Sequence, residues 1–215
     1  MLAPDQTPTD HEYFLSALEK RYKNYQMFST GFRSEFDFSW IDLGEPRYDQ
    51  VNTHATRLHT FNDTFWSVPN QGVRFGENDE NDAYTYSRAD EQEQVVWLRD
   101  GVYTIFDTAA PDIYISILWY EAFLDKLFRK ANISAYETRN GTTYASCIAT
   151  GYPNVYFMLD SHWMQIAPAE YLVDTSAAQD GKECRLKFRP IDAPFNVMGM
   201  PAYLNFYVIH NWSEG

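Results

Sequence analysis

Residues 102–116 read VYTIFDTAAPDIYIS, in which an apolar run ends at Asp107-Thr108 and resumes after a few small residues. A carboxylate and a hydroxyl at the tip of a strand can carry acid–base chemistry, because a positioned carboxylate can take or give a proton. Asp and Thr also favour turns, so the same pair can simply stabilise a solvent-facing turn. Asp107 and Thr108 are therefore candidate catalytic residues, and the turn is the open alternative.

Three other groups contain residue types found in catalytic or metal sites. Asp160-Ser161-His162 has the residue types of a triad, but triads are assembled from distant positions, so a β-turn explains this contiguous run better. His54 and His59 stand close together with no nearby cysteine, which favours a loop over a metal site. Cys147 and Cys184 do not have zinc-ligand spacing. The sequence predicts neither a metal site nor a cofactor.

The chain of 215 residues carries a formal net charge of −13, and its sequence pI is about 4.7. This charge argues against a nucleic-acid partner, because nucleic-acid affinity comes from Lys and Arg that neutralise phosphates. No apolar run approaches the roughly 20 residues that a membrane span needs. The first residues, MLAPDQTPTD, lack the basic-then-apolar pattern of a signal peptide. We therefore expect no nucleic acid, no transmembrane segment and no signal peptide in this chain.

Four N-x-S/T sequons begin at Asn62, Asn132, Asn140 and Asn211, and these are candidate glycosylation sites. Repulsion among carboxylates falls as they are protonated, so an acidic compartment also suits the chain. Together these features favour the secretory pathway, an endolysosomal or vacuolar lumen, or the extracellular space.

The residue pattern predicts a mostly β protein with a few helices. Residues 10–24 are typical of an amphipathic helix, and residues 119–131 of a second helix with a basic C-terminal end. Residues 94–108 contain two strand-like runs around Asp100-Gly101, which predicts a β-hairpin. A short helix is expected from Pro168, and further strands close the chain.

The order of these segments resembles the C-terminal lobe of the pepsin-like aspartic peptidases over nearly the whole chain. The family's second active-site motif is an apolar strand ending in D-T-G-S/T, then an apolar strand and a helix, as in the run from Tyr103 to the helix after Ile113–Ser116. Later family segments have counterparts in the same order: Cys147, residues 152–157, residues 168–171, Cys184, and residues 195–211 with Gly199. The segment that joins the family's two lobes is similar to residues 2–4, 14–18, 27–29 and 41–44.

This resemblance implies a pepsin-like lobe of antiparallel β sheets with a few short helices. It implies an inter-lobe connection and helix over residues 1–30, a C-terminal-lobe domain over residues 31–215, and an absent N-terminal lobe. It places Asp107 and Thr108 at catalytic positions and implies a disulfide between Cys147 and Cys184. Ala109 stands where the family motif has glycine, and its methyl group is expected to crowd the carboxylate.

The family's chemistry needs two carboxylates that share one proton, because like charges about 3 Å apart cannot both ionise. A lone Asp107 is expected to activate water poorly, so the isolated chain is predicted to be inactive. The leading hypothesis is a non-catalytic lobe, a pseudoenzyme acting as a structural or binding subunit. The alternative is half of an aspartic endopeptidase completed by a separate N-terminal lobe with the second Asp, and a homodimer is a third reading. We expect a protein partner to cover the Asp107 face.

Overall fold

The computed structural model describes residues 27–32, 39–47, 56–60, 65–76, 95–98, 101–147, 151–175, 183–204 and 206–211. Strands dominate these residues, so the prediction of a mostly β protein is confirmed. The helix predicted over residues 10–24 lies outside the described residues. The predicted division between residues 1–30 and 31–215 remains a prediction, and its boundary falls within the first described strand.

The largest sheet has the strand order β10-β9-β3-β5-β14-β6-β13, with β4 beside β3. Strand β14 pairs in parallel with β5 and antiparallel with β6, so it lies between the two strands that flank Asp107. The bounds are β3 Ser67–Gly76, β4 Val95–Trp97, β5 Tyr103–Phe106, β6 Ile113–Ser116, β9 Asn154–Leu159, β10 His162–Ile166, β13 Phe188–Ile191 and β14 Asn196–Met198.

The hairpin predicted around Asp100-Gly101 is wrong, although both strands exist. Strands β4 and β5 do not pair with each other; each pairs antiparallel with the ten-residue strand β3. Between them, Leu98 N donates to Gln71 O and Asn70 N donates to Val102 O, each at 3.0 Å, so the ladder along β3 continues. The physical reason is the length of β3, which offers one edge long enough for both strands.

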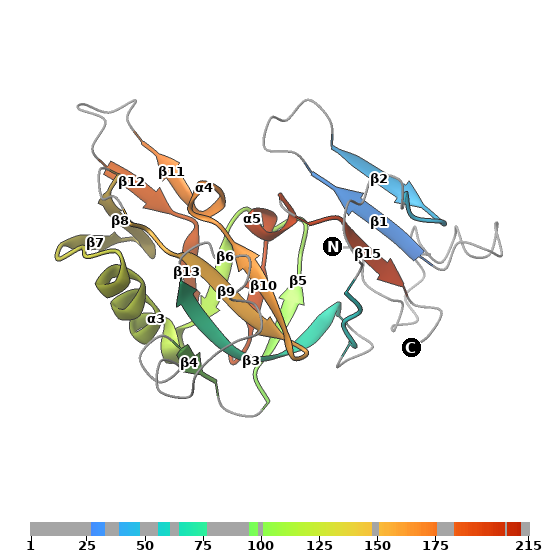
Figure 1. Cartoon of the computed structure of the whole chain (residues 1–215), viewed down its shortest axis with the longest axis horizontal. Helices are drawn as coiled ribbons and strands as arrows, with labels where there is room; N and C mark the ends of the chain where they lie inside the picture. Colours follow the sequence, from blue (N-terminus) through green and yellow to red (C-terminus); the bar gives the residue numbers. More distant parts are fainter. Residues whose placement is uncertain are drawn as a thin grey trace.

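A four-stranded sheet with the order β11-β12-β8-β7 packs next to helix α3 (Figure 1). Helix α3, Ile117–Lys130, confirms the helix predicted over residues 119–131, including the basic residues of its last turn. Its N-terminus is capped by Ser116, whose Oγ accepts from Leu118 N. The other bounds are β7 Tyr136–Arg139, β8 Thr142–Ser146, β11 Leu172–Asp174, β12 Glu183–Leu186 and α4 Pro168–Tyr171, which begins at proline as expected.

The third sheet joins the beginning and the end of the described chain. Strand β1, Met27–Gly31, pairs antiparallel with β2, Trp40–Leu43, and with β15, Val208–Asn211. Figure 1 shows this sheet at the opposite end of the molecule from α3 and the four-stranded sheet. The short helix α5, Met200–Tyr203, lies between these two parts, directly after β14.

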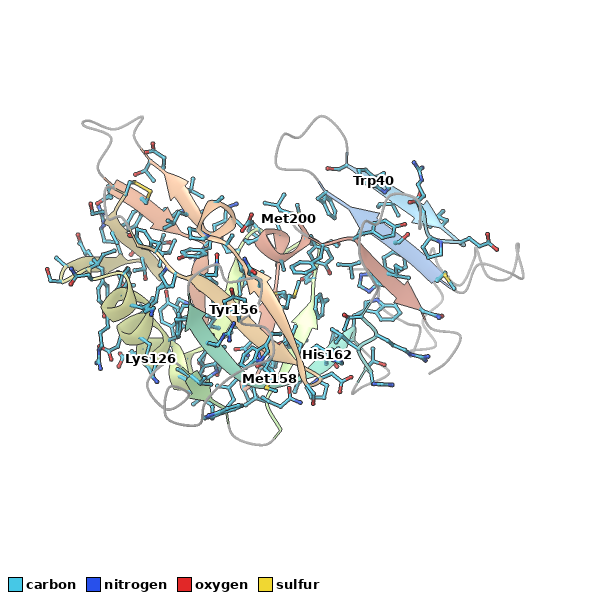
Figure 2. The ribbon with its side chains drawn as sticks, in the orientation of Figure 1. Trp40, Lys126, Tyr156, Met158, His162 and Met200 are labelled. Atoms are coloured by element: carbon cyan, nitrogen blue, oxygen red, sulfur yellow. A yellow bond between two sulfur atoms is a disulfide. The ribbon has the colours of Figure 1, made fainter. Side chains whose placement is uncertain are left out.

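Helix α3 closes the core of the large sheet with an aromatic contact surface. The fully buried Phe123 packs against Phe75 and Phe188, with ring centroids 5.2 and 4.8 Å away. On the same helix, Lys126 Nζ donates to Val95 O at 2.8 Å and so links α3 to β4 (Figure 2). These contacts join α3 to β3, β4 and β13 of the large sheet.

Candidate functional site

Asp107 lies directly after β5, on the loop of residues 107–112 that leads into β6. Its position between two strands is as predicted. The neighbouring chain segment holds this loop at two points: Asp107 N donates to Met198 O at 3.0 Å, and Met200 N donates to Ala110 O at 2.8 Å. The loop is therefore fixed by the end of β14 and the start of α5.

The Asp107 carboxylate forms a hydrogen bond within its own turn. Asp107 Oδ1 accepts from Ala109 N at 2.9 Å, and Asp107 O accepts from Ala110 N at 3.2 Å. A carboxylate that bonds to the backbone two residues later is a common way for aspartate to stabilise a turn. Ala109 is exposed and does not adopt a positive φ, so its methyl group fits this turn without strain.

A small pocket opens beside this loop, between the large sheet and the three-stranded sheet. Its volume is about 10 Å³, close to what one water molecule requires. Two lining residues come from the three-stranded sheet, and the others come from the residue before β3, the end of β5, the Asp107 loop and α5. The lining residues are Phe28, Trp66, Phe106, Asp107, Thr108, Tyr203 and His210.

His210 is a buried ionisable residue of this pocket. Its ring stacks on Phe28 with centroids 4.4 Å apart, and Trp66 approaches edge-on at 4.8 Å. His210 is only 5% exposed, and its Nε2 has no hydrogen-bond partner among the described residues. Burial disfavours the charged imidazolium and lowers the pKa of His210 to about 4.

Acid is therefore expected to destabilise the protein through His210. His210 takes up a proton near pH 6.5 in the unfolded state but only near pH 4 in the folded state. The contribution of neutral His210 to the free energy of unfolding is therefore fully present above pH 6.5 and is lost as the pH falls to about 4. This difference in pKa corresponds to a decrease of roughly 3 kcal/mol in the free energy of unfolding. His210→Phe keeps an aromatic ring against Phe28 and should abolish this part of the pH dependence. Urea unfolding between pH 4 and pH 7 measures it.

The exposed His162 provides the comparison, because His162→Gln also removes an imidazole but leaves the pocket intact, so the acid-dependent loss of stability should remain. An unchanged slope between pH 4 and 6.5 in His210→Phe would contradict the assignment.

Tyr203 brings a second buried polar group to the pocket. It is fully buried, and its Oη has no hydrogen-bond partner among the described residues. Burial, with a smaller contribution from the negative charge of Asp107, raises the pKa of Tyr203. The phenol therefore stays protonated and lies near enough to the Asp107 carboxylate to interact with its charge.

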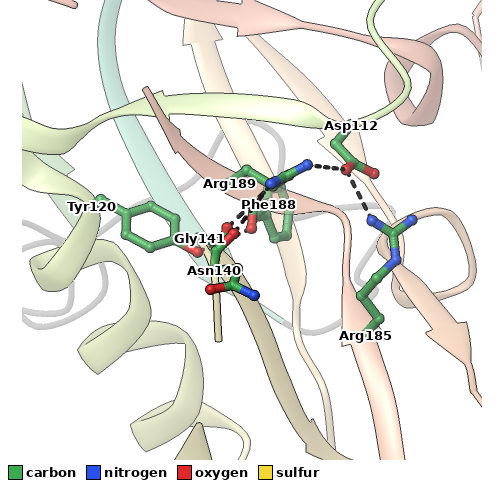
Figure 3. A network of polar contacts seen from close by, with 7 residues as sticks. All are labelled: Asp112, Tyr120, Asn140, Gly141, Arg185, Phe188 and Arg189. Carbon is green, nitrogen blue, oxygen red and sulfur yellow. Dashed lines mark hydrogen bonds and ion pairs between the residues drawn. The ribbon is translucent and has the colours of Figure 1, made fainter. Parts of the chain in front are cut away.

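The far end of the loop is anchored by a buried ion pair (Figure 3). Asp112 is 2% exposed, and its Oδ2 accepts from Arg185 Nη1 at 2.9 Å and lies 4.0 Å from Arg189 Nη1. Arg189 Nε also donates to Gly141 O at 3.3 Å, which extends the network to the β7–β8 turn. Removing one partner of a buried pair leaves an uncompensated charge, so this network links the loop to β12 through Arg185 and to β13 through Arg189.

In the contiguous run Asp160-Ser161-His162, the first two residues form the β9–β10 turn that the sequence predicts, and His162 begins β10. Asp160 and Ser161 have φ values of 44° and 67°, and His162 Nδ1 lies 2.8 Å from the carbonyl oxygen of Asp160, two residues earlier. The Asp160 carboxylate instead bonds to His59, through the backbone N at 2.8 Å and Nδ1 at 2.9 Å. The hydrogen bond from the His59 backbone N–H lowers the pKa of Asp160, and the hydrogen bond with the His59 side chain adds a smaller decrease. His54 lies outside the described residues.

Cys147 and Cys184 are disulfide-bonded, which confirms the predicted pair. Of the candidate glycosylation sites, Asn132, Asn140 and Asn211 are exposed, and Asn62 lies outside the described residues.

Sequence reasoning did not select Phe28, Trp66, Tyr203 or His210 as site residues. Phe28, Tyr203 and His210 stand in family-like segments and Trp66 in an apolar strand-like run, but neither pattern indicates that these residues meet around Asp107. Where residues are described, no group of three or more His, Cys, Asp or Glu side chains is placed to hold a metal ion. In that part of the chain no helix is both long and apolar enough to cross a membrane.

No protein-family model matches the chain, and neither does any curated protein. The fold and the site define a mostly β, disulfide-bonded protein in which a carboxylate-bearing loop borders a small aromatic pocket.

Proposed function

We propose that the chain is a pepsin-like lobe without catalytic activity of its own, which acts as a structural or binding subunit. The observation that carries this proposal is the position of β14 between β5 and β6, which holds Asp107-Thr108 at the tip of the loop. This order of strand, acidic loop and strand is what the resemblance to the aspartic peptidases implies. The tight packing of Gly199 against the same loop supports it further.

The chemistry of a single carboxylate supports the non-catalytic part of the proposal. Among the described residues that line the pocket, Asp107 is the one carboxylate, and one of its oxygens is already bonded to Ala109 N. Aspartic-peptidase chemistry needs a second carboxylate that shares the proton, so that one group takes a proton from water while the other protonates the carbonyl.

The test is a peptide-hydrolysis assay on the purified chain at about pH 3 to 5, where aspartic dyads work. We expect no cleavage of an unfolded protein substrate and no binding of pepstatin, because the second carboxylate is missing. Pepsin in the same buffer serves as the positive control. Pepstatin-sensitive cleavage that disappears in Asp107→Asn would overturn the proposal and would favour the homodimer.

The second candidate is the C-terminal half of an active aspartic endopeptidase. The partial exposure of Asp107 and Thr108 favours it, because a second carboxylate from another chain could approach this rim. Both candidates require a protein partner on the Asp107 face. Light scattering is therefore expected to detect a species larger than the 25.1 kDa monomer when the chain is purified from its natural source. A stable monomer there would count against both.

We further propose a secretory, endolysosomal, vacuolar or extracellular location. The disulfide supports it, because disulfides persist in oxidising compartments. The exposure of Asn132, which follows α3, and of Asn140, which lies between β7 and β8, is compatible with glycans. Figure 1 shows α3, β7 and β8 at the end of the molecule away from the three-stranded sheet. The test is the intact mass of the chain, expressed in a secretory host, before and after enzymatic deglycosylation. An unchanged mass would argue against the glycans.

A further inference from the structure

The pocket beside Asp107 gathers polar atoms that no described protein group satisfies. Tyr203 Oη and His210 Nε2 are both buried without hydrogen-bond partners, and both residues line the same cavity as Asp107. Buried polar atoms in native proteins are nearly always paired. A cavity that brings two unpaired polar groups to a carboxylate therefore points to a bound polar group.

The hydrogen-bonding capacity of these three residues defines what that group is. A carboxylate only accepts, a phenolic oxygen can accept, and a neutral imidazole accepts at Nε2 when its proton is on Nδ1. A primary ammonium has three donors and no acceptor. We propose that this pocket binds a primary ammonium group, which donates to Asp107, Tyr203 and His210.

The size and the walls of the pocket fit the same ligand. A volume of about 10 Å³ accommodates a group the size of a water molecule, which is the size of an ammonium head. The rings of Phe28, Trp66 and Phe106 line the cavity, and aromatic surroundings attract cations and exclude water. The net charge of −13 adds long-range attraction for a cation.

The ammonium group can belong to a lysine side chain of a partner or to a free alkylamine. The lysine source deepens the proposed function and rests on it, because it names what the partner presents to the Asp107 face. The pocket itself rests only on the described contacts, so binding is measured on the isolated chain. The hydrolysis and light-scattering tests address the proposed function, and the binding measurement addresses the pocket. A failure of one can therefore be told apart from a failure of the other.

The experiment is a titration of the full chain with n-butylammonium chloride at neutral pH and constant ionic strength, followed by calorimetry or NMR. The uncharged n-butanol, which has a similar shape, is the control ligand. We expect saturable binding of n-butylammonium only, weakened about tenfold or more in Asp107→Asn because a charge-assisted hydrogen bond is lost. Tyr203→Phe should weaken binding several-fold without changing the ring that packs in the core.

The matched control is Asp125→Asn, because Asp125 is an exposed carboxylate on α3 paired with Arg129 and lies away from the pocket. This variant should bind like the unchanged protein, and thermal unfolding verifies that every variant is folded. Tighter binding of N-acetyl-lysinamide than of n-butylammonium indicates the lysine source, and equal binding indicates a free amine. Equal binding of n-butanol, unchanged binding in folded Asp107→Asn, or no saturable binding of n-butylammonium overturns the inference.

Discussion

Replacing Gly199 with alanine is expected to destabilise the protein by about 3 kcal/mol or more, because the new methyl group has no space. A Cβ at this position would overlap the carbonyl oxygen of Asp112 and lie 2.5 Å from that of Ala110. Both contacts are with backbone atoms of the Asp107 loop, so neither can be relieved by a side-chain rotation. The loop would have to move away from β14 and lose the hydrogen bond between Met200 N and Ala110 O.

Urea unfolding of Gly199→Ala, followed by near-UV circular dichroism, measures this effect. The matched control is Gly76→Ala, because a Cβ at Gly76 would lie 3.7 Å from the Tyr156 ring, which is ordinary van der Waals contact. Gly76→Ala should change stability little. If Gly199→Ala unfolds at the same urea concentration as the unchanged protein, the close packing of the loop against β14 is wrong.

Removing the disulfide is expected to cost about 4 kcal/mol, because the bond closes a long loop in the unfolded chain. Cys147 and Cys184 are 37 positions apart, and the bond joins the end of β8 to β12. Cys184 pairs in the ladder with Ala145, so the link reinforces strand pairing that is already present. The effect should therefore arise mainly from greater freedom of the unfolded state.

The measurement compares urea unfolding of the double variant Cys147→Ala/Cys184→Ala with that of the unchanged protein, with and without a reducing agent. Reduction should lower the midpoint of the unchanged protein to near that of the double variant and leave the double variant unaffected. A midpoint of the unchanged protein that does not respond to complete reduction would refute the expected contribution.

Local patterns in the sequence predicted the elements that depend on neighbouring residues. The helix at Ile117–Lys130, the turn at Asp160-Ser161 and the start of α4 at Pro168 all agree with the structure. The disulfide followed from the resemblance to a family and is present. The hairpin at Asp100-Gly101 failed because a turn dipeptide reports local backbone preference and carries no information about a longer competing strand edge.

The sequence by itself determined that Asp107 and Thr108 end a strand, because the change from apolar to small polar residues is local. Only the tertiary structure decided what surrounds them. Phe28 and His210 reach the site through the pairing of β1 with β15, and Tyr203 reaches it through the packing of α5 behind the loop. These contacts join positions far apart in the chain, and they depend on strand pairing and on the exclusion of water from the core. Residue spacing encodes local periodicity, but long-range pairing emerges only when the whole chain packs.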